Sequence, residues 1–186
     1  DIEVIQVHAQ KRSQSRLEVS NAVSVISSEQ LAQRVLKDTV DLTGLAPNLK
    51  ASAVSGEGTT PSFSIRGIGM FDYNTSTVSP VAIYTDDVVG GGANFLATPL
   101  FDLAQVEVLR GPQGTLFGRN STAGAILLRT RQPEFEQSAA FALGVGQHHR
   151  HYGEVVLNTP VSEDTAVRVA LQQQRYQYSM QNQFPL

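Results

Sequence analysis

The chain has 186 residues, of which 41% are hydrophobic, and its 14 Lys and Arg oppose 17 Asp and Glu to give a net charge of −3. This length and composition predict a folded core rather than a disordered tail. No basic run is present to bind nucleic acid, and the absence of cysteine excludes disulfides, thiolate metal sites and thiol catalysis.

The N-terminal third predicts an extended segment followed by a strand and two short helices. Residues 1–12 alternate apolar and polar side chains, which indicates an extended conformation. Residues 23–26 predict a strand, and the serines that follow are placed to cap a helix over 28–34. A second helix, capped by Asp38, is expected to end before Pro47.

The middle of the chain alternates short strands with long loops. The loops are rich in Gly, Ser, Thr and Asn. The strands are expected at residues 49–54, 62–66, 81–84, 105–109 and 125–130. Short helices mixed with short strands predict an α+β domain with a small mixed sheet.

After Pro133 the pattern changes to long segments of dyad alternation, at 139–146, 152–158 and 165–176. Antiparallel strands of about 9 to 11 residues, apolar on one face and polar or small on the other, are typical of a transmembrane β-barrel wall. Three strands do not close a barrel, so a fragment of a wall is expected; the alternative is a soluble, polar-faced meander. The side chains expected to face lipid are Phe141, Leu143, Val145, Val155, Leu157, Val167, Val169 and Leu171.

Three stretches carry a resemblance to a known family: Phe63–Gly69, Val81–Val88 and Leu100–Ile126. Together they resemble the plug domain of TonB-dependent outer-membrane receptors. Residues 3–9 resemble the TonB box of these receptors. The resemblance implies a box in residues 1–12, a plug in 13–133 and, in 134–186, the first strands of a barrel of about 22 strands.

A TonB-dependent receptor imports a scarce ligand, such as siderophore-bound iron, and is not an enzyme. The resemblance therefore implies a bacterial outer-membrane location, with the plug in the barrel lumen and the N-terminus in the periplasm. It implies four partners: TonB with its inner-membrane motor proteins, outer-membrane lipid, the remainder of the barrel and an imported small ligand. No cofactor is implied. The sequence does not identify the imported substrate. The alternative functions are a soluble periplasmic or surface binding module and a hydrolase with an unrecognised site.

The resemblance assigns two sets of residues to binding partners. Arg66 and Arg110 each end a predicted strand just before a glycine, where plug arginines pair with barrel glutamates; the alternative is a pair of solvated arginines. The residues expected to bind TonB, by adding a strand to its sheet, are Val4, Ile5, Gln6, Val7, His8 and Ala9.

Plug loops that are too long for simple hairpin turns are expected to touch the substrate. They offer apolar and aromatic surface beside polar groups, a mixture that ligand sites favour. The alternative is that the aromatic side chains only anchor their own loops. The expected substrate-facing residues are Met70, Phe71, Asp72, Tyr73, Asn74 and Phe95.

The sequence gives little support to a phosphate-binding, catalytic or metal site. The glycines near Arg110 are not followed by the Gly-Lys-Ser/Thr of a phosphate-binding loop, and no Gly-x-Ser-x-Gly nucleophile motif occurs. His148, His149 and His151 hint at a metal site but have no adjacent carboxylate, so a solvated turn is the preferred interpretation.

Overall fold

A computed structural model describes residues 6–7, 14–15, 19, 21–34, 36, 38–53, 61–70, 77–90, 96–97, 99–118, 120–146 and 150–175. The chain divides into two compact units, Asp1–Thr130 and Arg131–Leu186, and each is described by itself. The division lies close to the expected one after residue 133.

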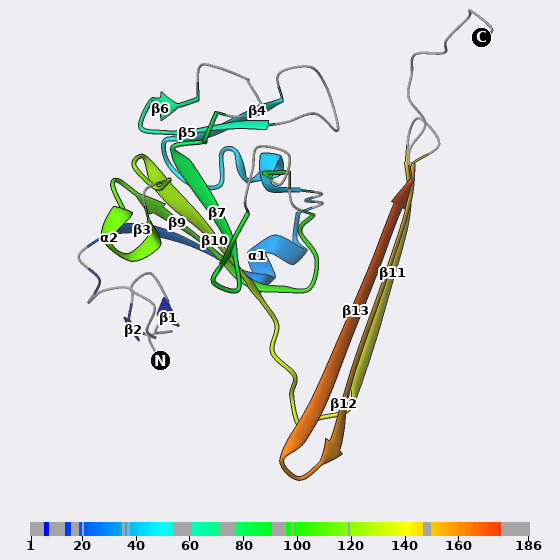
Figure 1. Ribbon diagram of the computed structural model, residues 1–186. Helices are drawn as coiled ribbons and strands as arrows, with labels where there is room; N and C mark the ends of the chain where they lie inside the picture. The colour runs from blue at the N-terminus through cyan, green and yellow to red at the C-terminus, as the bar shows by residue number, and fades with distance from the viewer. Residues whose placement is uncertain are drawn as a thin grey trace, which may run out of the picture. The chain divides into compact units, whose positions relative to one another are not determined.

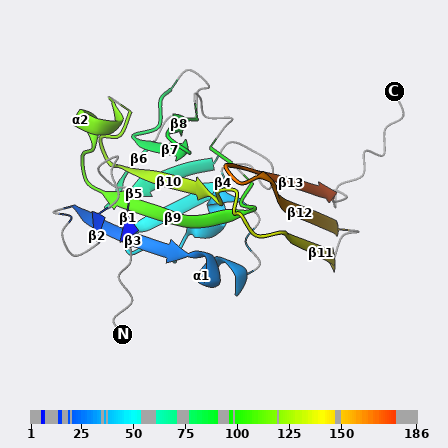
Figure 2. The ribbon, with the colours of Figure 1, turned by 90° about the horizontal axis from the view of Figure 1, so that it is seen from below.

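A five-stranded mixed sheet forms the centre of the first unit (Figure 2). Its strands, in spatial order, are β3 (Ala22–Ser27), β9 (Leu103–Arg110), β10 (Gly124–Thr130), β7 (Val81–Thr85) and β8 (Val88–Val89). The β10–β7 pair is parallel, and the other pairs are antiparallel. The small mixed sheet predicted from the sequence is confirmed.

Two smaller sheets accompany the central one (Figure 1). β4 (Leu49–Ala53), β5 (Pro61–Ile65) and β6 (Ile68–Gly69) form an antiparallel three-stranded sheet. β1 (Gln6–Val7) and β2 (Gln14–Ser15) form a two-stranded antiparallel pair.

The helices are short. α1 (Ser28–Ala32) begins with a capping box, in which the Ser27 hydroxyl accepts from the amide of Gln30 and the Gln30 side chain accepts from the amide of Ser27. α2 (Gly114–Phe117) follows β9.

The second helix predicted from the sequence is corrected. Asp38 caps it as expected, accepting from the amide of Val40, but it is a 3₁₀ helix, η1 (Thr39–Leu42), which ends well before Pro47. Three of the five residues from Thr39 to Thr43 are β-branched, and Gly44 then adopts a φ of +83°, so the chain turns after one helical turn.

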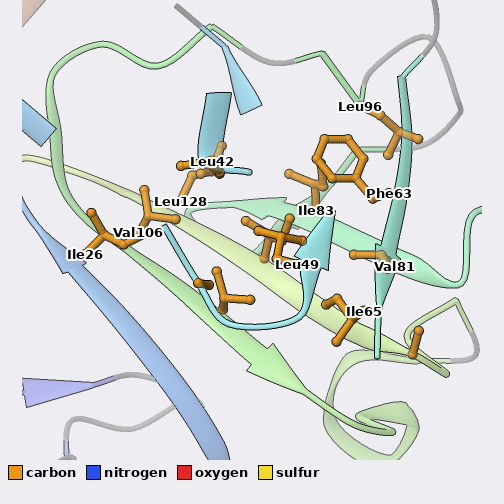
Figure 3. Packing of buried hydrophobic residues seen from close by; sticks show 14 of the residues in the cluster. Ile26, Leu42, Leu49, Phe63, Ile65, Val81, Ile83, Leu96, Val106 and Leu128 are labelled. Atoms are coloured by element: carbon orange, nitrogen blue, oxygen red, sulfur yellow. The ribbon is translucent and has the colours of Figure 1, made fainter. Parts of the chain in front are cut away.

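The main hydrophobic core lies on one face of the five-stranded sheet (Figure 3). Ile83, Val106 and Ile126 from three neighbouring sheet strands pack there with Leu42 of η1 and Phe63 of β5. The β4–β6 sheet and η1 therefore contribute the opposite side of this core. Phe63 and Val106 are fully buried.

A second cluster lies on the other face of the same sheet. Tyr84, Leu109 and Leu127 point to this face, and Val7 of β1 and Phe117 of α2 pack against them. Because β7, β9 and β10 are buried on both faces, their sequences are nearly continuous apolar runs instead of alternating patterns.

The second unit is a three-stranded antiparallel sheet with the strands in chain order: β11 (Ser138–Gly146), β12 (Arg150–Ser162) and β13 (Thr165–Arg175). The antiparallel order predicted from dyad alternation is confirmed (Figure 1). All eight side chains expected on the outward face are exposed, from 43% for Val167 to 87% for Val145, whereas Val156 and Asn158 on the opposite face of β12 are buried.

Within the described residues, no helix has the length and apolar character needed to cross a membrane.

Candidate functional site

Arg66 lies in the tight turn between β5 and β6. Its backbone is left-handed, with φ at +54°, and its amide donates to the carbonyl of Asn48 at 3.1 Å. Its side chain is exposed. A left-handed non-glycine residue is uncommon, and here it places Arg66 at the tip of the turn that follows β5.

Arg110, at the end of β9, comes from a different motif but lies close to Arg66. A Cβ placed on Gly111 would be 3.6 Å from Nη1 of Arg66, so that guanidinium lies next to the residue that follows Arg110. Nε of Arg110 donates to the carbonyl of Ala22 at 3.4 Å. Within the described part of the chain neither arginine forms an ion pair. The fold therefore brings the two predicted docking arginines together.

The loop after Arg110 is held by its own polar groups. Gln113 is buried, its amide donates to the carbonyl of Ser121 at 2.9 Å, and its side chain accepts from Asn21 at 3.1 Å. The hydroxyl of Ser121 donates to the carbonyl of Gly118 at 2.7 Å. These contacts support the sequence interpretation of the glycine-rich motif as a scaffold and not a phosphate cradle.

Gly124 begins β10 where the chain backbones come closest. Its φ is +156°, and a Cβ there would clash with the carbonyl of Leu109 and lie 2.7 Å from Cδ1 of Ile65. Only glycine fits this position without displacement of the backbone.

Two of the predicted TonB-binding residues, Gln6 and Val7, are described, and Val7 is less accessible than expected. Gln6 and Val7 are extended, as predicted, but they pair with Ser15 and Gln14. Val7 is fully buried in the second cluster. The other members of the predicted segment, Val4, Ile5, His8 and Ala9, lie outside the described residues.

The predicted substrate-facing set is corrected at Met70. Its side chain is 5% exposed, and its carbonyl accepts from the hydroxyl of Ser62 at 3.2 Å. Met70 directly follows β6, so the β5–β6 turn directs its side chain inward, where it offers no surface to a ligand. Phe71, Asp72, Tyr73, Asn74 and Phe95 lie outside the described residues.

Tyr84 and Phe117 join the central sheet to α2. Their rings make an edge contact with centroids 5.2 Å apart, and the hydroxyl of Tyr84 donates to the carbonyl of Phe117. Burial raises the pKa of Tyr84 above its ordinary value. The phenol therefore remains protonated at neutral pH, and its hydroxyl can donate the hydrogen bond to the carbonyl of Phe117.

Sequence reasoning missed three polar arrangements. Asp86 and Asp87 in the β7–β8 turn bind Thr130 and Arg129 at the end of β10. Asn158 of β12 binds the backbone of the segment before β11. Glu107 is fully buried on β9 and accepts from the side chain of Gln105 at 2.7 Å.

In the part of the chain that the structure describes, no three His, Asp or Glu side chains lie close enough together to hold a metal ion. Two of the three candidate histidines, His148 and His149, lie outside the described residues.

The arrangement defines a plug domain followed by a fragment of a barrel wall, and comparison with known proteins agrees. The model of the TonB-dependent receptor plug domain matches residues 15–125. The chain therefore belongs to the TonB-dependent receptor plug family.

Its relatives include a vitamin B12 transporter of Vibrio vulnificus, 28% identical over 77% of this chain and 23% of the relative. Another is the pesticin receptor of Yersinia enterocolitica, 28% identical over 88% of this chain and 24% of the relative. These relatives are transporters and receptors, not enzymes.

Solved structures of receptors share the fold. The ferric yersiniabactin uptake receptor of Yersinia pestis superposes with a TM-score of 0.74 over 82% of this chain and 24% of that chain, at 24% identity. The pyoverdine outer membrane receptor of Pseudomonas aeruginosa gives 0.77 over 94% and 25%, at 18% identity. The chain thus spans about a quarter of the length of its relatives.

Proposed function

We propose that the chain is the gating plug and first wall strands of a TonB-dependent outer-membrane receptor that actively imports a scarce ligand. The observation that carries the proposal is the plug-family match over residues 15–125, in a fold that also brings Arg66 and Arg110 together. A vitamin B12 transporter and a ferrioxamine receptor among the relatives favour siderophore-bound iron or a ligand of similar size.

The second unit supports an outer-membrane location over a soluble binding module. Eight apolar side chains form the outward face of three adjacent strands, and Phe141, Leu143 and Val145 of β11 are each more than 80% exposed. Soluble proteins rarely expose a continuous apolar patch of this kind. The hydrocarbon interior of a membrane provides the apolar surroundings that such a patch needs.

TonB engages residues 4–9 from the periplasm and transmits force from the inner-membrane proton gradient. Binding as an added strand supplies main-chain hydrogen bonds along the segment. Because Val7 is fully buried, its side chain must leave the second cluster before TonB can hold the whole segment. Force on the released segment then rearranges the plug and opens a path for the ligand, so no nucleotide or metal cofactor is needed.

The test is the variant Ile5→Pro in the complete receptor. Proline removes one backbone donor and fixes φ, so the added strand fails to form. We expect TonB-dependent uptake to be lost while ligand binding to whole cells is unchanged. Ser13→Pro, outside the proposed segment, is the control and should transport normally. Normal uptake by the Ile5→Pro receptor would refute the placement of the TonB-binding segment.

Arg66 and Arg110 are proposed to dock the plug against carboxylates of the remaining barrel wall. Neither has an ionic partner among the described residues, although the Arg66 guanidinium lies beside Gly111, the residue after Arg110. Cations within a barrel lumen require opposite charges nearby.

Phe71, Asp72, Tyr73, Asn74 and Phe95 are proposed to supply the plug's share of the ligand site. Replacing Phe71, Tyr73 and Phe95 together with alanine should weaken ligand affinity about ten-fold or more, because each aromatic contact contributes on the order of 1 kcal/mol. Equilibrium binding to the purified receptor measures this. Unchanged affinity, with the plug still folded, would mean that these rings only anchor their loops.

A further inference from the structure

The end of the plug is fastened by four bonds that we call the plug-side clasp, made by Asp86, Asp87, Arg129 and Thr130. Asp87 accepts two parallel bonds from the guanidinium of Arg129, at 2.9 and 3.0 Å. The carboxylate of Asp86 accepts from the amide of Thr130 at 3.0 Å and from its hydroxyl at 2.6 Å. The last residues of β10 are therefore fixed to the β7–β8 turn.

A second set of bonds fastens the chain where the wall strands begin, and we call it the wall-side clasp. The side-chain oxygen of Asn158 accepts from the amide of Glu134 at 3.0 Å. Its side-chain nitrogen donates to the carbonyls of Glu134 at 2.8 Å and Glu136 at 2.7 Å. Asn158 is 1% exposed, so the side chain that makes these bonds is sheltered from water.

In both clasps, a side chain continues the hydrogen bonding of a strand pair beyond the last paired residues. Leu128 pairs with Thr85, and beyond this pair the carboxylate of Asp86 takes the amide of Thr130. Ser138 pairs with Asn158. Before this pair, the side-chain amide of Asn158 hydrogen-bonds to the backbone of the segment that leads into β11. On the wall side this side chain holds backbone that the strand ladder leaves unpaired, whereas on the plug side Arg129 and Thr130 are also paired with β9.

We propose that the wall-side clasp sets the length of the tether between the plug and the barrel wall, while the plug-side clasp and the pairing of β10 with β9 fix the other end. Three residues, Arg131, Gln132 and Pro133, stand between Thr130 and Glu134, and three extended residues span about 10 Å. With the wall-side clasp open the tether covers residues 131–137 and spans about 24 Å. Closed clasps therefore keep the attached end of the plug within a short distance of the wall while the rest of the plug rearranges, a consequence that rests on the proposed gating function.

Amide exchange in the complete receptor, purified in detergent micelles, tests the clasps directly. Asp86→Gly removes both acceptors and suits the left-handed backbone at this position, where φ is +45°. We expect about ten-fold or faster exchange at Thr130 in Asp86→Gly, with Glu134 unchanged. Asn158→Leu, or Asn158→Ser if the leucine variant misfolds, should accelerate Glu134 and leave Thr130 unchanged.

Glu163→Gln, which removes an exposed carboxylate from the β12–β13 turn, is the matched control and should change neither amide. Equal exchange at Thr130 and Glu134 in wild-type and variant receptors would overturn the clasps.

Leakage of a large antibiotic across the outer membrane then tests the tether. Asn158→Leu and a wild-type receptor with four Gly and Ser residues inserted after Gln132 both lengthen the tether to seven residues, so both should leak several-fold more. Faster exchange without added leakage in either receptor would overturn the tether role. Loss of the proposed gating function itself would instead appear as ligand uptake that does not require TonB.

Discussion

At the scale of single residues, Asp87 shows how an ion pair can offset an unfavourable backbone conformation. It occupies a turn position with φ at +68°, where glycine is normally favoured. The left-handed backbone costs an aspartate on the order of 1 kcal/mol, and the two-pronged ion pair with Arg129 offsets that cost. The sequence could not predict this pair because its members are 42 residues apart.

Gly124 is a residue where the fold leaves no room for a side chain. Gly124→Ala places a methyl group against the carbonyl of Leu109 and the side chain of Ile65, at a φ of +156°. We expect the plug to lose about 2 to 4 kcal/mol of unfolding free energy from strain and displaced packing. Urea unfolding followed by a plug-specific probe measures the loss.

Gly114→Ala is the matched control for that experiment. Gly114 begins α2, and nothing lies within 4 Å of the position its Cβ would take. Alanine is a better helix former than glycine, so stability should stay the same or rise slightly. Equal losses in both variants would show that close approach at Gly124 is not the cause.

At the scale of elements, the sequence predicted long, regular segments well and short ones poorly. The wall strands were predicted from dyad alternation, and the Ser27 cap correctly located the start of α1. The two-residue strands β6 and β8 were missed because two residues carry no period. Met70 was assigned to the surface for the same reason, since the short β6 hairpin that directs it inward has no sequence signal.

The outward face of the wall strands is expected to contact lipid. Leu157 is 52% exposed at the middle of β12, and Leu157→Lys would place a charge against hydrocarbon at a cost of about 2 to 4 kcal/mol. We expect less folded receptor in the outer membrane, measured by the heat-dependent shift of the barrel in gel electrophoresis.

Gln174→Lys is the control, because Gln174 lies on the opposite, half-buried face of β13. It should assemble nearly normally. If both lysine variants assembled equally well, the outward face of these strands would not face lipid.

At the scale of the whole molecule, long motifs allowed the family to be identified from the sequence, while the position of the N-terminal segment could not be predicted. Alternation predicted that Gln6 and Val7 are extended, and they are. A short apolar–polar pattern does not show which surface its apolar side packs against. The burial of Val7 beside Leu109 and Leu127 could therefore be seen only in the structure. The same burial links the availability of the proposed TonB-binding segment to the integrity of the plug core.

The arginine pair yields a prediction that depends on the complete receptor. If Arg66 and Arg110 dock against carboxylates in the lumen, Arg66→Gln/Arg110→Gln leaves those carboxylates without partners, which costs about 3 to 5 kcal/mol. If both are solvated, the cost stays below about 1 kcal/mol. Urea unfolding of the plug within the intact barrel distinguishes these magnitudes. Arg34→Gln, at an exposed position after α1, supplies the baseline for removing one surface charge. A double variant no less stable than this baseline would leave the docking role without support.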